Sequence, residues 1–135
     1  MKRAAATLFC LGAALAAGAY AQDQGEFSAW MKTTGGTVGK LRKEIDAKAF
    51  PDAAKDAATL HDVFKHVEDY FAKTNTDDAV KMAQAAGTAS QKLADAAGAS
   101  DADGAAASLK AIQGTCGGCH MAHREKLPEG GYKIK

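Results

Sequence analysis

The chain has 135 residues, of which 47% are hydrophobic and 24% charged, with only 2 prolines. This length and composition are typical of one globular domain and exclude a disordered or collagen-like chain. Seventeen Lys and Arg residues against sixteen Asp and Glu residues give a net charge of +1. The chain therefore lacks the basic field that holds nucleic acid through its phosphates, and we expect no nucleic-acid partner.

Residues 1–21 have the three parts of a secretory signal peptide. A short basic start (Lys2, Arg3) precedes an apolar run, and the segment ends in a small-x-small cleavage site at Ala21. The run is too short and too weakly flanked to predict a membrane span, although an uncleaved N-terminal anchor is the alternative. Cleavage would remove Cys10, one of three cysteines. We expect an exported, periplasmic protein that does not bind the membrane after cleavage.

Hydrophobic spacing in the mature domain, residues 22–135, predicts four helices. Apolar residues recur at steps of three and four, and no window alternates with period two. The fold class is therefore expected to be all-α, an antiparallel up-down-up-down four-helix bundle with a non-helical tail. The expected helices span residues 26–46, 51–73 and 77–98, with a fourth that follows a cap at Ser100 or Asp101 and carries its apolar face to His123.

Two features indicate that something bulky completes this bundle. Gly35-Gly36 lies inside the first helix, where each glycine costs roughly 1 kcal/mol relative to alanine. Close approach of a large group would explain the pair. The third and fourth helices are rich in alanine, so the core is thin for a domain of this size, and an apolar group could add the missing volume.

The segment Cys116-Gly117-Gly118-Cys119-His120 is the attachment signature of a c-type haem. The two thiols can add to the two haem vinyl groups, and the histidine supplies a nitrogen to the iron. The two glycines keep the backbone clear of the porphyrin. We therefore expect one haem c, bound covalently through Cys116 and Cys119, with His120 on the iron.

Three other interpretations of the two cysteines remain. A thioredoxin-like redox pair would sit at the start of a helix after a strand, and no strand is predicted. A zinc site would need one more strong ligand, and His123 is the nearby candidate. A disulfide would explain neither the histidine nor the glycines.

The other axial position of the iron is expected to involve Met31. An antiparallel bundle brings the start of its first helix and the end of its fourth together, so Met31 and His120 can face each other across a haem. Methionine opposite histidine is the ligation of electron-carrying cytochromes. The residues alone favour a core methionine that fills space.

The two ends of the mature chain resemble class II cytochromes c. Residues 28–41 resemble the first helix of that family, in which methionine-lysine is followed by two residues, glycine-glycine, an apolar residue and glycine. Residues 116–120 followed by Arg124 resemble its C-terminal haem site, with His123 in place of an aromatic residue. The resemblance covers the mature chain in helix order and implies that Met31 ligates the iron.

That family has low-spin members that carry electrons and high-spin cytochromes c′ whose open sixth site binds gases. We expect a periplasmic single-electron carrier with His/Met-ligated iron, which is not an enzyme and exchanges electrons with redox partner proteins. The alternative is a protein that binds nitric oxide or carbon monoxide. A haem peroxidase is a weaker third hypothesis, because no distal acid-base pair is evident. The resemblance also implies a homodimer.

Several further residues also have expected roles. Arg124 suits pairing with a haem propionate, because its planar fork matches a carboxylate. Trp30 is expected on the helix face near the haem, and the lysines of the C-terminal tail could steer an acidic partner. His61 borders an apolar face and is expected to be a boundary histidine with its own hydrogen bond.

Overall fold

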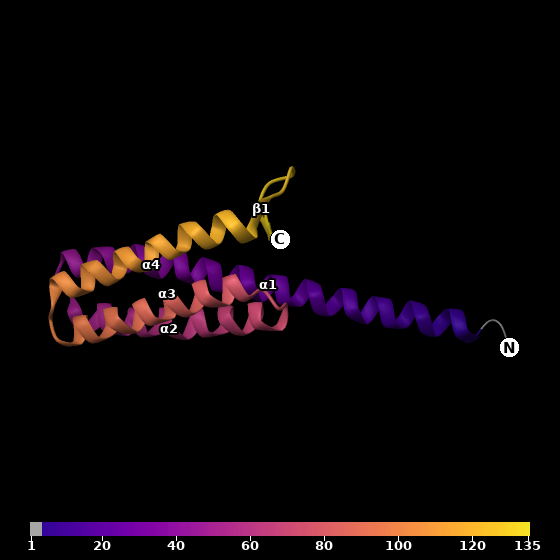
Figure 1. The fold of residues 1–135 in the computed structure, drawn as a ribbon, viewed down its shortest axis with the longest axis horizontal. Coiled ribbons are helices and arrows are strands. Elements are labelled where there is room, and N and C mark those ends of the chain that lie inside the picture. Colours follow the sequence, from indigo (N-terminus) through magenta and orange to yellow (C-terminus); the bar gives the residue numbers. More distant parts are fainter. Residues whose placement is uncertain (1–3) are drawn as a thin grey trace.

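A computed structural model describes the backbone of residues 4–135 and the side chains of residues 24–135. This part of the chain forms four α-helices and two short strands: α1 (Ala4–Asp46), α2 (Phe50–Lys73), α3 (Asp77–Gly98), α4 (Ala102–His123), β1 (Arg124–Lys126) and β2 (Tyr132–Ile134). Successive helices run antiparallel and pack against one another (Figure 1). The predicted four-helix bundle is confirmed.

The ends of the helices follow the predicted signals. Pro51 lies in the first turn of α2, where its missing N–H leaves no hydrogen bond unmade. Thr76 precedes α3 as expected of a cap, but its side chain makes no capping hydrogen bond, and the helix ends at Gly98 as predicted. Asp101 caps α4, and its side chain accepts a hydrogen bond of 3.0 Å from the backbone N–H of Gly104.

Replacing Asp101 by alanine is expected to lower the free energy of unfolding by about 1 kcal/mol, because the N–H of Gly104 loses its acceptor. Chemical denaturation of the two proteins measures this difference. Asp103→Ala is the matched control, since it removes a carboxylate of the same turn and leaves the cap in place. An equal loss in both variants would show that the cap bond is not the cause.

The hydrophobic core is built from the faces that the periodicity predicts. On α4 the buried residues end at Ile112, and beyond it Cys116 is partly buried and packs against the core. On α3 the buried face consists mostly of alanine, which lets the neighbouring helices approach closely. The larger buried side chains are Leu41, Ile45, Leu60, Val63, Phe64, Val67, Phe71, Leu93, Leu109 and Ile112.

The first helix is longer than predicted. It begins at Ala4, runs through Gly35 and Gly36 without a break, and extends past the ends of the other helices (Figure 1). The side chains of the predicted signal peptide, residues 1–21, lie outside those described, so its cleavage stays a prediction. Within the described part of the chain, no helix has a stretch long and apolar enough to span a membrane.

The C-terminal tail, expected only to be non-helical, folds into an antiparallel hairpin. We call residues 124–135 the C-terminal hairpin. Arg124 pairs with Ile134 and Lys126 with Tyr132. Gly130 and Gly131 form the turn with φ angles of 97° and 81°, a conformation that side chains rarely adopt. The all-α prediction therefore misses these two strands.

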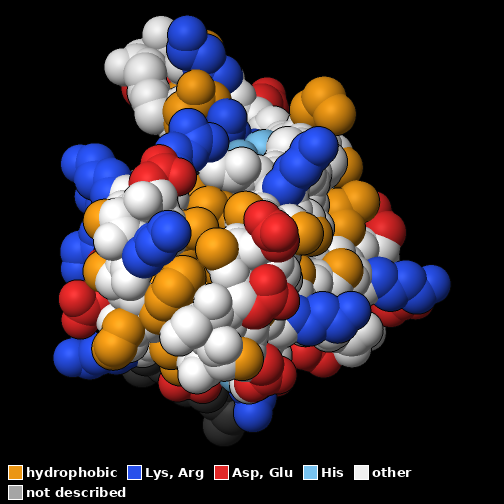
Figure 2. All heavy atoms as spheres, turned by 90° about the vertical axis from the view of Figure 1, so that its left-hand side faces the viewer, with side chains coloured by type: hydrophobic (Ala, Val, Ile, Leu, Met, Phe, Trp, Pro, Cys, Tyr) orange, Lys and Arg blue, Asp and Glu red, His pale blue; other side chains and the backbone are white. Residues whose placement is uncertain are grey.

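Charged side chains of both signs are interspersed over the end of the bundle that carries the α1–α2 and α3–α4 connections (Figure 2). Hydrophobic side chains lie between them. This distribution agrees with the nearly balanced charge of the sequence.

Candidate functional site

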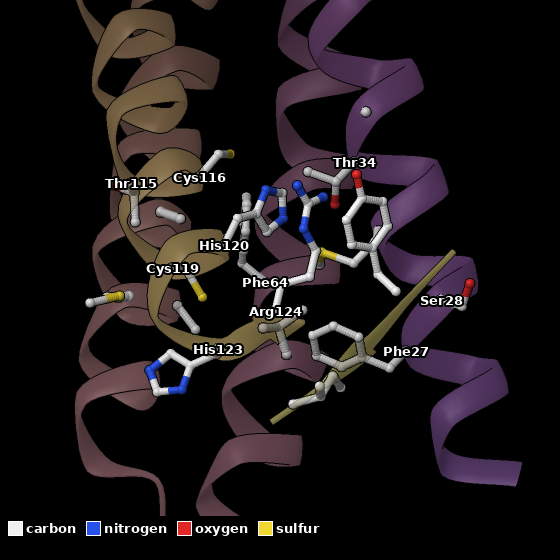
Figure 3. Close-up of a pocket in the computed structure, with 18 of the residues that line it drawn as sticks. Phe27, Ser28, Thr34, Phe64, Thr115, Cys116, Cys119, His120, His123 and Arg124 are labelled. Atoms are coloured by element: carbon white, nitrogen blue, oxygen red, sulfur yellow. The ribbon is translucent and has the colours of Figure 1, made fainter. Parts of the chain in front are cut away.

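A cavity of about 610 Å³ lies among α1, the last turns of α4 and the C-terminal hairpin, with α2 and α3 behind it (Figure 3). Its volume lies within the roughly 300–1,000 Å³ of small-molecule and cofactor sites. The walls are largely apolar. They are formed by Phe27, Met31 and Val38 from α1, Phe64, Val67 and Phe71 from α2, Met82, Ala83 and Ala86 from α3, and Ile134 from the hairpin.

Three side chains of the predicted attachment segment line this cavity. Cys119 and His120 follow Cys116 by three and four positions, so one face of α4 carries all three side chains (Figure 3). Both cysteines are free and half-buried. Burial raises the pKa of each thiol, and neighbouring Cys116 and Asp78 raise the pKa of Cys119 further. Both cysteines are therefore uncharged thiols at neutral pH.

His120 carries a neutral imidazole at the same pH. Burial lowers its pKa, and the positive charge of Arg124 lowers it further. Figure 3 shows the ring extending from α4 into the space that faces α1. A neutral ring nitrogen is the form of histidine that binds a metal ion.

Met31 lines the same cavity from α1. Gly35, one turn further along, also lines it, and a Cβ added there would meet no atom within 4 Å. The wall beside Met31 is thus open rather than filled by packing. Thr34, between them, is buried, and its hydroxyl donates a 2.9 Å hydrogen bond to the carbonyl of Trp30.

The rim of the cavity is positively charged. Among the described residues that line it, Lys32, Arg124 and Lys133 are cationic, and none is Asp or Glu. The guanidinium carbon of Arg124 lies 3.9 Å from the centre of the Tyr132 ring, a cation–π contact. An apolar cavity with a cationic rim suits an apolar ligand that carries carboxylates.

The His123 side chain links the last turn of α4 to the first turn of α3. Its Nε2 donates to Oδ2 of Asp78 over 2.9 Å, and its ring lies 5.6 Å from that of Phe71. Partial desolvation raises the pKa of Asp78, but the hydrogen bond and charge of His123 outweigh it, so the pKa is lowered overall. Sequence periodicity placed His123 on this face and could not identify Asp78 as its partner.

The Asp78–His123 contact is expected to make stability depend on pH at the acid end. Because the pKa of Asp78 in the folded protein lies below its ordinary value of 3.8, its contribution is fully present above that value. The contribution is lost as the pH falls through the lowered pKa. Denaturation of the wild type and of Asp78→Asn should give a stability difference that shrinks between about pH 5 and pH 2. A difference that stays constant over this range would contradict the assignment.

The other aromatic and imidazole groups lie elsewhere. Nδ1 of His61 lies 3.1 Å from the carbonyl of Gly87, so His61 is the boundary histidine predicted. Trp30 does not line the cavity. Its ring stacks on that of His66, with centroids 5.3 Å apart, beside a smaller hollow of about 240 Å³ between α1 and α2.

The competing interpretations of the cysteines gain no support from this geometry. Within residues 24–135, no three His, Cys, Asp or Glu side chains gather as they would around a metal ion. The pair lies near the end of α4 rather than at the start of a helix after a strand, which is where a thioredoxin-like pair would sit.

Comparison of the sequence with protein-family models gives no matching family, and comparison with curated proteins gives no matching protein. The functional features of the chain are therefore the cavity and the side chains that line it. Those side chains include all five residues that the sequence predicts for the site: Met31, Cys116, Cys119, His120 and Arg124.

Proposed function

We propose that the chain is a monohaem c-type cytochrome that carries single electrons, built like the class II cytochromes c. One observation carries this proposal. Met31 near the start of the bundle and the segment from Cys116 to His120 near its end line a single cavity. They are the residues that haem attachment and His/Met ligation require.

The cavity suits haem c on several independent grounds. Its volume is that of a cofactor site and its walls are apolar, as a porphyrin ring requires. The cations at its rim can pair with the two propionates. A neutral His120 and open space beside Gly35 complete the fit. Bound haem would supply the one-electron iron couple.

The residues of the chain would attach, ligate and enclose the cofactor. Each thiol would add its S–H across one vinyl group, with sulfur forming a C–S bond and the proton a C–H bond, so that no electrons are gained or lost. His120, through one ring nitrogen, and Met31, through its thioether, would hold the iron. The apolar walls would exclude water and help to set the potential.

Absorption spectra of the ferric and ferrous protein test this function. Ligation by His120 and Met31 predicts a low-spin spectrum with a methionine-to-iron charge-transfer band. A high-spin spectrum, with rapid binding of carbon monoxide or nitric oxide, would contradict the electron carrier and support the gas-binding alternative. Turnover of peroxide would support the peroxidase hypothesis instead.

We also propose that the protein is exported. Its cofactor site lies in the mature domain, which remains after the signal peptide is cleaved. The mature protein would begin at Gln22 and meet redox partner proteins in the periplasm. N-terminal sequencing of the protein recovered from that compartment tests the cleavage site. A homodimer, implied by the family resemblance, would appear as a doubled mass in size-exclusion chromatography with light scattering.

A further inference from the structure

The proposed function leaves most of the C-terminal hairpin unexplained. The hairpin doubles back from the end of α4, and residues 131–134 line the cavity. Ile134 is partly buried and packs against the hydrophobic core. Figure 3 shows the final strand crossing the space between α4 and α1, near Phe27. This segment forms a wall of the cavity that none of the four helices supplies.

One contact attaches the hairpin to α4, and another joins its two strands. The backbone N–H of Lys135 donates to the carbonyl of His123 over 3.0 Å, so the end of the chain is attached to the last turn of α4. Nζ of Lys133 lies 3.3 Å from a carboxylate oxygen of Glu125 on the opposite strand. A two-stranded hairpin alone is marginal in water, so packing on the cavity side must contribute to holding it.

The hairpin also supplies two of the three cationic side chains that line the cavity, of which Lys133 is paired with Glu125. Of the three cationic residues that line the cavity, Arg124 and Lys133 belong to it, and only Lys32 comes from a helix. Tyr132 is 56% exposed, yet its ring lies against the Arg124 guanidinium. Arg124 would otherwise be a long, freely rotating side chain, and the aromatic face restricts where its charge lies.

We propose that the C-terminal hairpin is a cap over the carboxylate-bearing edge of the bound cofactor, and that Tyr132 is a positioning residue that aims Arg124 at one carboxylate. This inference rests on the proposed function. The cap keeps water from that edge and holds cations beside it. Both effects disfavour the ferric state, which carries one more positive charge than the ferrous state, so the cap raises the reduction potential.

Four variants of the full protein, matured with haem, test the cap: deletion of residues 127–135, Tyr132→Ala, Tyr132→Phe, and Lys126→Ala as a control. Lys126 is exposed, pairs with Tyr132 in the hairpin and does not line the cavity. Intact mass reports covalent haem in each, and redox titration reports the midpoint potential.

Deletion is expected to shift the ferric–ferrous equilibrium about tenfold towards ferric, which for one electron is a potential lower by about 59 mV. Tyr132→Ala should lower the potential by a smaller amount, whereas Tyr132→Phe, which keeps the ring, and Lys126→Ala should keep the wild-type value. Wild-type potentials in haem-bearing deletion and Tyr132→Ala proteins would overturn the cap. If the deletion protein fails to hold haem, Tyr132→Ala against Tyr132→Phe decides. A wild-type chain without covalent haem would overturn the proposed function and this inference with it.

Discussion

A chain in which Cys116 and Cys119 are both replaced by serine is expected to carry no covalently bound haem. The two thiols line the cavity from one face of α4, and serine hydroxyls do not form the corresponding thioether bonds. The expected loss is complete. Extraction with acidified acetone should remove all haem absorbance from the variant protein and leave it on the wild type, and intact mass should agree.

Single substitutions and a neighbouring control sharpen this experiment. Cys116→Ser and Cys119→Ser should each keep haem through the one remaining bond. Thr115 lines the same cavity in the same turn and donates its hydroxyl to the carbonyl of Ala111, so Thr115→Ala should keep both bonds. Covalent haem on the double variant would show that attachment occurs elsewhere or does not need these thiols.

Replacing Met31 by alanine is expected to change the spin state of the iron and to lower its reduction potential. Removal of the proposed thioether ligand would leave that position on the iron open or occupied by water, so the spectrum should become high-spin and the charge-transfer band should vanish. Axial ligands set haem potentials over a range of about 0.8 V, so we expect a fall on the order of 0.1 V or more. Absorption spectra and redox titration measure both effects.

A second methionine on the cavity wall provides the matched control. Met82 lines the cavity from α3, so Met82→Ala removes the same side chain from the same cavity without removing the proposed ligand. Its spectrum should remain low-spin. An unchanged spectrum in Met31→Ala would reject the ligand assignment, and a high-spin spectrum in Met82→Ala would transfer that role to α3.

Much of the bundle follows from local signals in the sequence. The core face of α2 from Leu60 to Phe71 obeys the helical period, and Asp101 caps α4 through a short-range hydrogen bond. Thr34 breaks the apolar pattern of α1 yet is buried, and its hydroxyl donates a hydrogen bond to the carbonyl four residues earlier. That bond satisfies a polar group that periodicity alone would place at the surface.

The features that the sequence does not predict depend on contacts between residues far apart in the chain. The strands of the hairpin have three residues each, too few for a period-two pattern. Asp78 meets His123 only because the start of α3 lies beside the end of α4. The site is predictable only in part. Spacing alone places Cys116, Cys119 and His120 on one helix face. The cavity that they share with Met31 and the hairpin depends on how the helices pack.

The most direct test of the central claim is mass spectrometry of the peptide containing residues 111–124, which trypsin releases by cutting after Lys110 and Arg124. From protein produced with its signal peptide in cells that mature c-type cytochromes, this peptide should carry one haem, bound through the sulfurs of Cys116 and Cys119. A peptide without haem, whether with free thiols or with a disulfide between the two cysteines, would contradict the assignment of the chain as a c-type cytochrome.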